Sequence, residues 1–114
     1  MKIATYDWHR KKGAVFEDFF GCEIPSQYGQ MENEYWAIRK STALRDVSYF
    51  GKIRMNGRDR RRFLNGMISN EVKSIEPGMG TWGLFLDVKG HVQADMKVYA
   101  FDDHFLMVMQ HYVR

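Results

Sequence analysis

Apolar and polar positions alternate most clearly in the second half of the chain. Two strand-like segments, residues 81–88 and residues 91–101, lie on either side of Lys89-Gly90, and this spacing predicts a β-hairpin. A third apolar run, at residues 105–109, follows a turn at Asp102-Asp103. Together these three segments predict an antiparallel meander.

Two earlier segments have the periodicity of helices. In residues 31–41, the apolar side chains of Met31, Tyr35 and Ile38 recur at helical spacing. In residues 58–67, a narrow apolar stripe lies opposite a group of arginines, and the stripe consists of Phe63, Leu64 and Met67. Both segments are therefore predicted to be helices.

The remaining segments complete the expected fold. Residues 47–55 alternate as a strand does, with Ile53 and Met55 on one face, and Asn56-Gly57 ends this segment. Residues 1–30 are predicted to be irregular, because glycine and proline interrupt any long periodicity at Gly21, Pro25 and Gly29. The predicted fold class is α+β, an antiparallel sheet meander with two or three helices.

Composition narrows the class of protein. The length of 114 residues suits one small domain, and 45% hydrophobic with 27% charged residues is an ordinary globular composition. A single cysteine, Cys22, excludes an internal disulfide, and no cysteine and histidine spacing suggests zinc. No apolar run is long enough for a membrane span, and the first residues lack the apolar core of a signal peptide. We therefore expect a reduced, soluble, cytoplasmic protein without membrane contact.

The formal net charge is +3, and much of the excess is local. Four arginines fall within five residues, at Arg58, Arg60, Arg61 and Arg62. Such a cluster can neutralise nucleic-acid phosphates, or it can be the solvated face of a helix. The second interpretation is favoured, since no nucleic-acid-binding signature accompanies the cluster.

The hairpin contains the chemistry that stands out. Asp95 lies in the middle of the second predicted strand, on the face opposite Ala94 and Met96, and mid-strand aspartate is uncommon. It is either a solvent-facing carboxylate paired with Lys97 or a carboxylate that binds a proton-bearing nitrogen heterocycle. Trp82, on the partner strand, is either core or an aromatic wall beside that carboxylate. The pattern alone favours the first interpretation of Asp95.

Five segments of the chain match known sequence patterns. GCEIPSQY at residues 21–28 is similar to G-W-E-M-P-V-Q-Y, and ALRDVSYFGKI at residues 43–53 is similar to G-L-F-D-V-S-H-M-G-K-I. RFLN at residues 62–65 resembles R-F-L-[NQ], and ISNEV at residues 68–72 resembles V-T-N-D-V. GHVQADMKVY at residues 90–99 is similar to G-G-V-I-D-D-L-I-V-Y. In this order and at these separations, the five segments resemble the glycine-cleavage T-protein family (GcvT, aminomethyltransferase).

The resemblance implies a tetrahydrofolate-binding enzyme of one-carbon metabolism. In this family an aminomethyl group, carried on the lipoyl arm of H-protein, is transferred to tetrahydrofolate with release of ammonia. Asp95 matches the acidic residue that approaches the reactive nitrogens of folate, and Trp82 matches the position against the pteridine. Phe50, Val108 and Gln110 match further folate contacts. The implied cofactor is tetrahydrofolate, the implied partners are folate and lipoylated H-protein, and nucleic acid is not expected.

Departures from the family pattern keep a second function open. Ala94 stands where the family has an acidic residue, Cys22 stands for a tryptophan, and Tyr49 for a histidine. Folate-binding relatives of the YgfZ type, which assist iron–sulfur cluster maturation without transferring a one-carbon unit, have a similar K-G-x-x-x-A-D pattern, and other relatives are demethylases.

Family members are also longer, so residues 1–114 are expected to be the N-terminal portion of an aminomethyltransferase folate-binding domain. Such a portion is expected to have weak or no activity alone.

Overall fold

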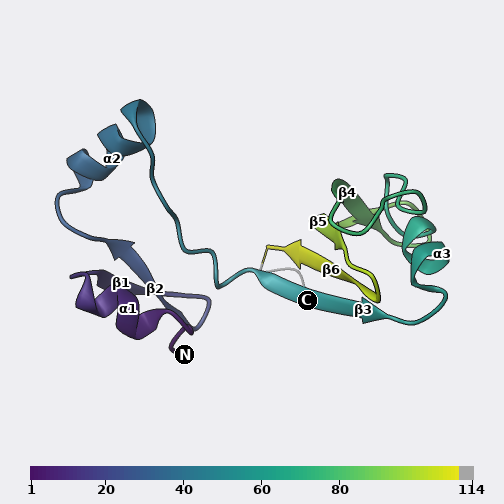
Figure 1. Cartoon of the computed structure of the whole chain (residues 1–114), viewed down its shortest axis with the longest axis horizontal. Coiled ribbons are helices and arrows are strands. Elements are labelled where there is room, and N and C mark those ends of the chain that lie inside the picture. Colours follow the sequence, from purple (N-terminus) through teal and green to yellow (C-terminus); the bar gives the residue numbers. More distant parts are fainter. Residues whose placement is uncertain (111–114) are drawn as a thin grey trace. The chain divides into compact units, whose positions relative to one another are not determined.

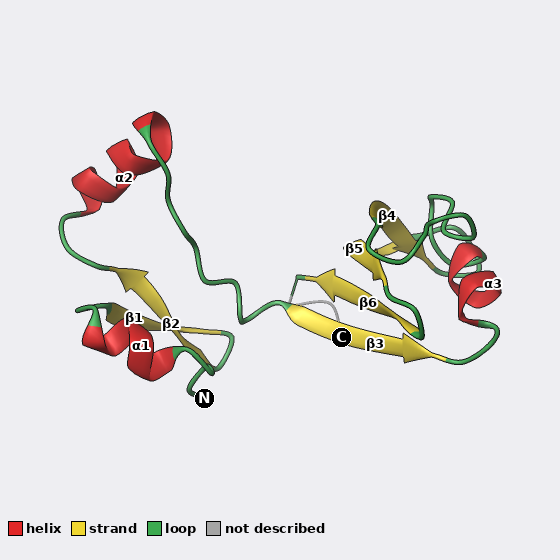
Figure 2. Ribbon diagram, viewed as in Figure 1, coloured by secondary structure: helices red, strands yellow, loops and turns green. Residues whose placement is uncertain are grey.

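The computed structural model describes residues 1–110, which form the α+β structure drawn in Figures 1 and 2. The chain divides into two compact units, Met1–Tyr49 and Phe50–Arg114. The elements of the first unit are α1 (Tyr6–Lys11), β1 (Val15–Phe19), β2 (Cys22–Gln27) and α2 (Met31–Lys40). Those of the second are β3 (Gly51–Asn56), α3 (Arg60–Asn65), β4 (Gly80–Leu86), β5 (Val92–Ala100) and β6 (His104–Met109).

The first unit corrects the expectation that residues 1–30 are irregular, because α1, β1 and β2 lie there. β1 and β2 form an antiparallel hairpin that ends at the pair Phe19 and Cys22. The two connecting residues, Phe20 and Gly21, both have positive φ, at 53° and 79°, as a type I′ turn requires. A phenylalanine in this conformation is unusual, so the sequence carries no ordinary hairpin signal here.

The helix expected at residues 31–41 is confirmed as α2, but it contributes nothing to a core. No residue of α2 is buried, and Met31 and Ile38 are 71% and 68% exposed. The buried apolar side chains of the first unit are Ile3 near its start, Cys22 and Ile24 on β2, and Tyr49 at its end. The apolar periodicity of residues 31–41 therefore predicted the helix correctly without predicting burial.

The second unit confirms the predicted meander. Its sheet has the order β3-β6-β5-β4, and all neighbouring strands are antiparallel. The helix expected at residues 58–67 is the shorter α3. The strand expected to begin at residue 47 begins at Gly51, because the Asp46 carboxylate accepts a hydrogen bond from the Ser48 N–H and turns the chain before the sheet.

One face of this sheet forms the core. On β5, Ala94, Met96, Val98 and Ala100 are buried at every second residue. They pack with side chains from β6, from α3 and from the segment that follows α3, which are Leu64, Ile68, Val72, Ile75, Phe105, Met107 and Met109. The opposite side is called the open face below, and its residues on β4, β5 and β6 are Trp82, Leu84, Asp95, Lys97, Tyr99, Leu106 and Val108.

Candidate functional site

Strand register gathers the residues matched to the family's folate contacts on the open face. Trp82 pairs with Lys97, and Lys97 pairs with Val108, so these three side chains form one row across the sheet. In the neighbouring row, Asp95 pairs with Leu84. Asp95 and Trp82 are therefore diagonal neighbours, whose Cα atoms lie about 7–8 Å apart in such a ladder.

Phe50 and Gln110 lie next to the end of the paired strands. Met109 pairs with Met96 on one side and with Gly51 on the other. Gln110 directly follows Met109 and Phe50 directly precedes Gly51, so each lies one residue beyond the last pair of its ladder. The five residues therefore come from the same end of the sheet, with Trp82 and Val108 in one row and Asp95 in the next.

The Asp95 carboxylate is half-buried on the open face. It forms no hydrogen bond or ion pair with any residue between positions 1 and 110, and the expected pairing with Lys97 is absent from that part of the chain. A carboxylate is an acceptor only, so its lone pairs have no donor among those residues. The group is therefore available to accept hydrogen bonds from a ligand on the open face.

Trp82 is not a core residue. It is 61% exposed, and two further apolar side chains of the open face, Leu84 and Tyr99, are 39% and 41% exposed. An exposed indole beside an unpaired carboxylate offers a flat ring both stacking area and one directional hydrogen-bond acceptor. This is the chemistry expected of a site for a polar heterocycle.

A segment that sequence reasoning left without a role supports this site from the side. Residues 67–70 lie along the free edge of β4, where Ile68 bridges to Phe85 in antiparallel fashion. Asn70 Nδ2 donates to the carbonyl oxygen of Trp82 at 2.9 Å. The motif at residues 68–72 was a signal of family resemblance, but only the tertiary structure shows what its asparagine contacts.

The first unit holds a separate buried polar network, within a groove lined by Thr5, Trp8, Tyr28 and Tyr49 among others. His9 is 8% exposed, and its Nε2 lies 2.9 Å from Asp46 Oδ2. Because a carboxylate only accepts, Nε2 carries the proton, and in the neutral ring Nδ1 accepts from the Tyr28 hydroxyl. The network therefore joins α1, the residue after β2 and the segment after α2.

The charges of this network have shifted pKa values. Burial alone would raise the pKa of Asp46, but hydrogen bonds from Ser48, His9 and Thr5 outweigh burial and lower it to about 2. Burial, together with the nearby carboxylates of Asp46 and Glu34, raises the pKa of the Tyr28 hydroxyl. Asp46 therefore stays ionised and Tyr28 stays protonated, and the hydrogen bonds of the network hold these segments of the first unit together.

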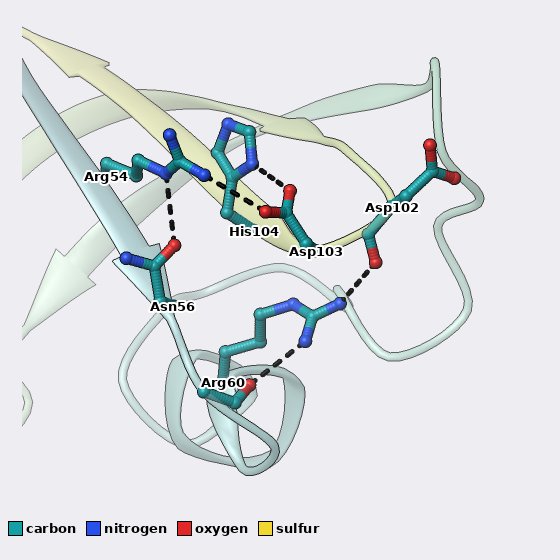
Figure 3. Close-up of polar contacts among 7 residues, drawn as sticks. Arg54, Asn56, Arg60, Asp102, Asp103 and His104 are labelled. Atoms are coloured by element: carbon teal, nitrogen blue, oxygen red, sulfur yellow. Dashed lines mark hydrogen bonds and ion pairs between the residues drawn. The ribbon is translucent and has the colours of Figure 1, made fainter.

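Two of the four clustered arginines, Arg60 and Arg61, are committed to the fold. Arg60 donates to the backbone carbonyl of Gly57 at 3.0 Å. It also donates to that of Asp102 at 2.9 Å, and Figure 3 draws this second hydrogen bond. Arg61 donates to three carbonyls of the following loop, those of Val72, Lys73 and Ile75. These two side chains therefore hold loops in place and do not present a free basic face.

A second group in Figure 3 closes the turn between β5 and β6 against β3. Arg54 donates from Nη2 to Asp103 Oδ2 at 3.0 Å and from Nε to Asn56 Oδ1 at 3.1 Å. The hydrogen bond from His104 is the main cause that lowers the pKa of Asp103. Since Asp103 is exposed, this group is a surface clamp on the sheet.

Within positions 1–110, no three acidic, histidine or cysteine side chains lie close enough together to hold a metal ion. No helix in the same stretch has the length and apolar character required to cross a membrane.

The fold matches that of a solved T-protein. The crystal structure of the glycine cleavage system aminomethyltransferase T from Bartonella henselae superimposes with a TM-score of 0.77, at 20% sequence identity, over 97% of this chain and 31% of that one. This likeness shows the fold class, which is that of the N-terminal part of a GcvT-type protein. The chain also matches the family model of the GCVT N-terminal domain over residues 5–114, and it belongs to that family.

Curated relatives are named aminomethyltransferases. The aminomethyltransferase of Prosthecochloris aestuarii is 36% identical over 109 residues, which is 95% of this chain and 30% of the relative. That of Cupriavidus pinatubonensis is 37% identical over 103 residues, covering 89% of this chain and 28% of the relative. The chain thus spans about 30% of the length of the curated relatives that it matches.

Proposed function

We propose that the protein is a tetrahydrofolate-dependent one-carbon transferase of the aminomethyltransferase type, and that the open face of its second unit binds the pteridine ring. The single observation that supports this most directly is the Asp95 carboxylate, which has no partner among residues 1–110, beside the exposed Trp82. Membership of the GCVT family and the names of the relatives support the reaction class.

The residues present suit the ring. A pteridine is flat and bears several N–H groups, so it needs a stacking surface and hydrogen-bond acceptors. Trp82 supplies the surface, and the diagonal separation of about 7–8 Å lets one edge of a stacked ring reach Asp95. Leu84, which lies directly opposite Asp95, adds apolar contact and keeps water from that side of the carboxylate.

Each residue then has a physical role. Asp95 accepts hydrogen bonds from ring N–H groups and stabilises positive charge that develops on a nearby nitrogen. Phe50 and Val108 contact the ring at its flanks, and the Gln110 amide offers both a donor and an acceptor. Tetrahydrofolate supplies the ring nitrogens that receive the one-carbon unit. A lipoylated H-protein is the proposed donor of an aminomethyl group.

The most conspicuous departure from the family pattern does not weaken this proposal. Ala94 replaces an acidic residue, but it is 5% exposed and packs in the core, on the side of the sheet away from Asp95. A side chain at this position does not reach a ligand on the open face. Its identity therefore says little about folate binding.

The proposal is tested with two variants in the protein at its full native length. Asp95→Asn keeps the shape of the side chain and removes the charge, so turnover is expected to fall at least about 100-fold with the fold intact. Asp102→Asn is the matched control, because it removes one exposed carboxylate of the same unit whose side chain is far from Trp82 in the sheet. Full activity of Asp95→Asn contradicts the catalytic assignment.

Binding is measured separately from turnover. Trp82→Ala is expected to weaken tetrahydrofolate binding about tenfold, because a stacked aromatic contact is lost. Trp36→Ala, on the exposed α2 of the first unit, is the control and should leave affinity unchanged. Folate binding without turnover, in the presence of an aminomethyl donor, would favour the non-enzymatic YgfZ-type function instead.

A further inference from the structure

A short segment, residues 67–70, lies along the outer edge of β4, on the side away from β5, and forms hydrogen bonds there much as an additional strand would. The Ser69 N–H donates to the Leu84 carbonyl and the Ser69 hydroxyl accepts from the Leu84 N–H, both at 2.9 Å. The Leu86 N–H donates to the Met67 carbonyl at 2.8 Å. Residues 67–69 thereby form hydrogen bonds with backbone groups of Leu84 and Leu86 that point away from β5. An edge strand otherwise leaves such groups exposed.

The Asn70 side chain forms hydrogen bonds with the part of β4 that contains Trp82. Its Nδ2 donates to the Trp82 carbonyl at 2.9 Å and to Thr81 Oγ1 at 2.8 Å. Its Oδ1 accepts from the Glu71 N–H at 2.9 Å. A carbonyl oxygen only accepts and a backbone N–H only donates, so these partners fix the orientation of the amide.

The close approach of the segment depends on Gly83, which lies between Trp82 and Leu84. A Cβ placed on Gly83 would lie 2.5 Å from Ile68 Cγ1 and 3.5 Å from Asn70 Cβ. Ile68 therefore occupies the space where any other residue would have a side chain. Asn70 reaches Trp82 because Ile68 rests directly on the strand.

We propose that Asn70 is a positioning residue for Trp82, which fixes the strand backbone so that the indole is presented on the open face next to Asp95. This inference rests on the proposed function, in which Trp82 stacks on the ligand. Trp82 lies on an outer strand that pairs with β5 on one side only. On the other side, its carbonyl accepts from Asn70 at 2.9 Å and, more weakly, from the Thr81 hydroxyl at 3.4 Å. Loss of the Asn70 hydrogen bonds removes the main support on the outer side of the strand, so the backbone at Trp82 and its indole become less fixed.

The test uses Asn70→Asp, which keeps the size of the side chain and the acceptor for Glu71 but places a carboxylate oxygen against the Trp82 carbonyl. We expect the dissociation constant for tetrahydrofolate to rise about tenfold. The matched control is Asn65→Ala, which loses the hydrogen bond from the Val72 N–H at 2.9 Å in the same unit without touching β4. It should lower thermal stability and leave the dissociation constant unchanged.

A double-mutant cycle separates positioning from a general structural effect. In a Trp82→Ala background, Asn70→Asp should weaken binding by less than twofold, since its effect passes through the missing indole. An equal tenfold loss in both backgrounds, or unchanged binding by Asn70→Asp alone, overturns the inference.

A spectroscopic readout without ligand keeps the inference separate from the proposed function. With every other tryptophan of the protein replaced by phenylalanine, Trp8 and Trp36 included, 5-fluorotryptophan labels Trp82 alone. Asn70→Asp should shift and broaden its ¹⁹F signal, and Asn65→Ala should not. If Trp82→Ala binds folate normally, the proposed function fails. The ¹⁹F signal tests the positioning role independently of that result, because an unchanged signal in Asn70→Asp overturns the role of Asn70.

Discussion

Replacing Gly83 by alanine tests the packing beneath the candidate site directly. The new Cβ would lie 2.5 Å from Ile68 Cγ1 and 2.7 Å from Ile68 Cδ1, closer than carbon atoms approach in folded proteins. Ile68 is only 7% exposed and belongs to the core cluster, so it cannot turn into solvent to make room. Either the segment at residues 67–70 moves off β4 or the side chain adopts a strained rotamer.

The expected cost follows from two opposing effects. Overpacking of a well-packed site costs about 1–3 kcal/mol. Replacing glycine by alanine restricts the unfolded chain and returns about 0.4–1 kcal/mol. The free energy of unfolding of Gly83→Ala should therefore fall by about 1–2 kcal/mol, which corresponds to a decrease in Tm of roughly 4–16 °C for a domain of this size.

The assay is urea unfolding followed by circular dichroism, with Gly51→Ala as the control. A Cβ on Gly51 would meet Met109 Cγ at 3.4 Å, an ordinary contact, so this variant should stay within about 0.5 kcal/mol of the parent.

Removing the opposing side chain completes the experiment. Ile68→Ala alone should cost about 2–5 kcal/mol, because it leaves a cavity. The new methyl group of Gly83→Ala partly fills that cavity, so the double variant should lose less than the sum of the single losses, by at least about 1 kcal/mol. Additive losses would refute the proposed contact between Gly83 and Ile68.

Two further predictions concern the polar ties of each unit. The folded pKa of Asp46 is about 2, below its ordinary 3.8, so its contribution to stability is present above about pH 4 and is lost as the pH falls towards 2. The contribution is about 2 kcal/mol, and Asp46→Asn should flatten the dependence of the unfolding free energy on pH in this window. An unchanged dependence would contradict the role of the hydrogen bonds that Asp46 accepts from Ser48, His9 and Thr5. Arg61→Ala should destabilise the second unit by about 1–3 kcal/mol and raise hydrogen exchange at residues 71–76, because three carbonyls lose their donor. Arg62→Ala, an exposed neighbour, is the control, and equal effects of the two variants would refute the assignment.

Local sequence signals predicted the elements whose structure is decided locally. Lys89-Gly90 and the alternation along residues 91–101 gave the hairpin of β4 and β5, and glycine at position 90 has the positive φ of 84° that its turn requires. The hairpin of β1 and β2 was missed, because its turn places Phe20 in a conformation that phenylalanine seldom adopts.

The candidate site depended on information that the local pattern lacks. The face on which Asp95 lies follows from strand alternation, and the resemblance to GcvT supplied the five candidate residues. Their approach to one end of the sheet depends on the pairing of β6 with both β5 and β3, which joins distant parts of the chain. Asn70 and Gly83 were not identified, because their importance does not lie in any periodicity. It lies in tertiary contacts, which are the hydrogen bond from Asn70 to Trp82 and the close approach of Ile68 to Gly83.

The position of β3 in the sheet has a consequence for how the second unit folds. β4, β5 and β6 are neighbours in sequence and can zip together as two successive hairpins, but β3 pairs with β6 across the whole intervening chain, Gly51 against Met109. Closing that long loop carries a large entropic cost, which is recovered only when a paired β6 already offers a template. Folding of the unit is thus expected to nucleate in the meander and to finish with the docking of β3, the strand that directly follows Phe50.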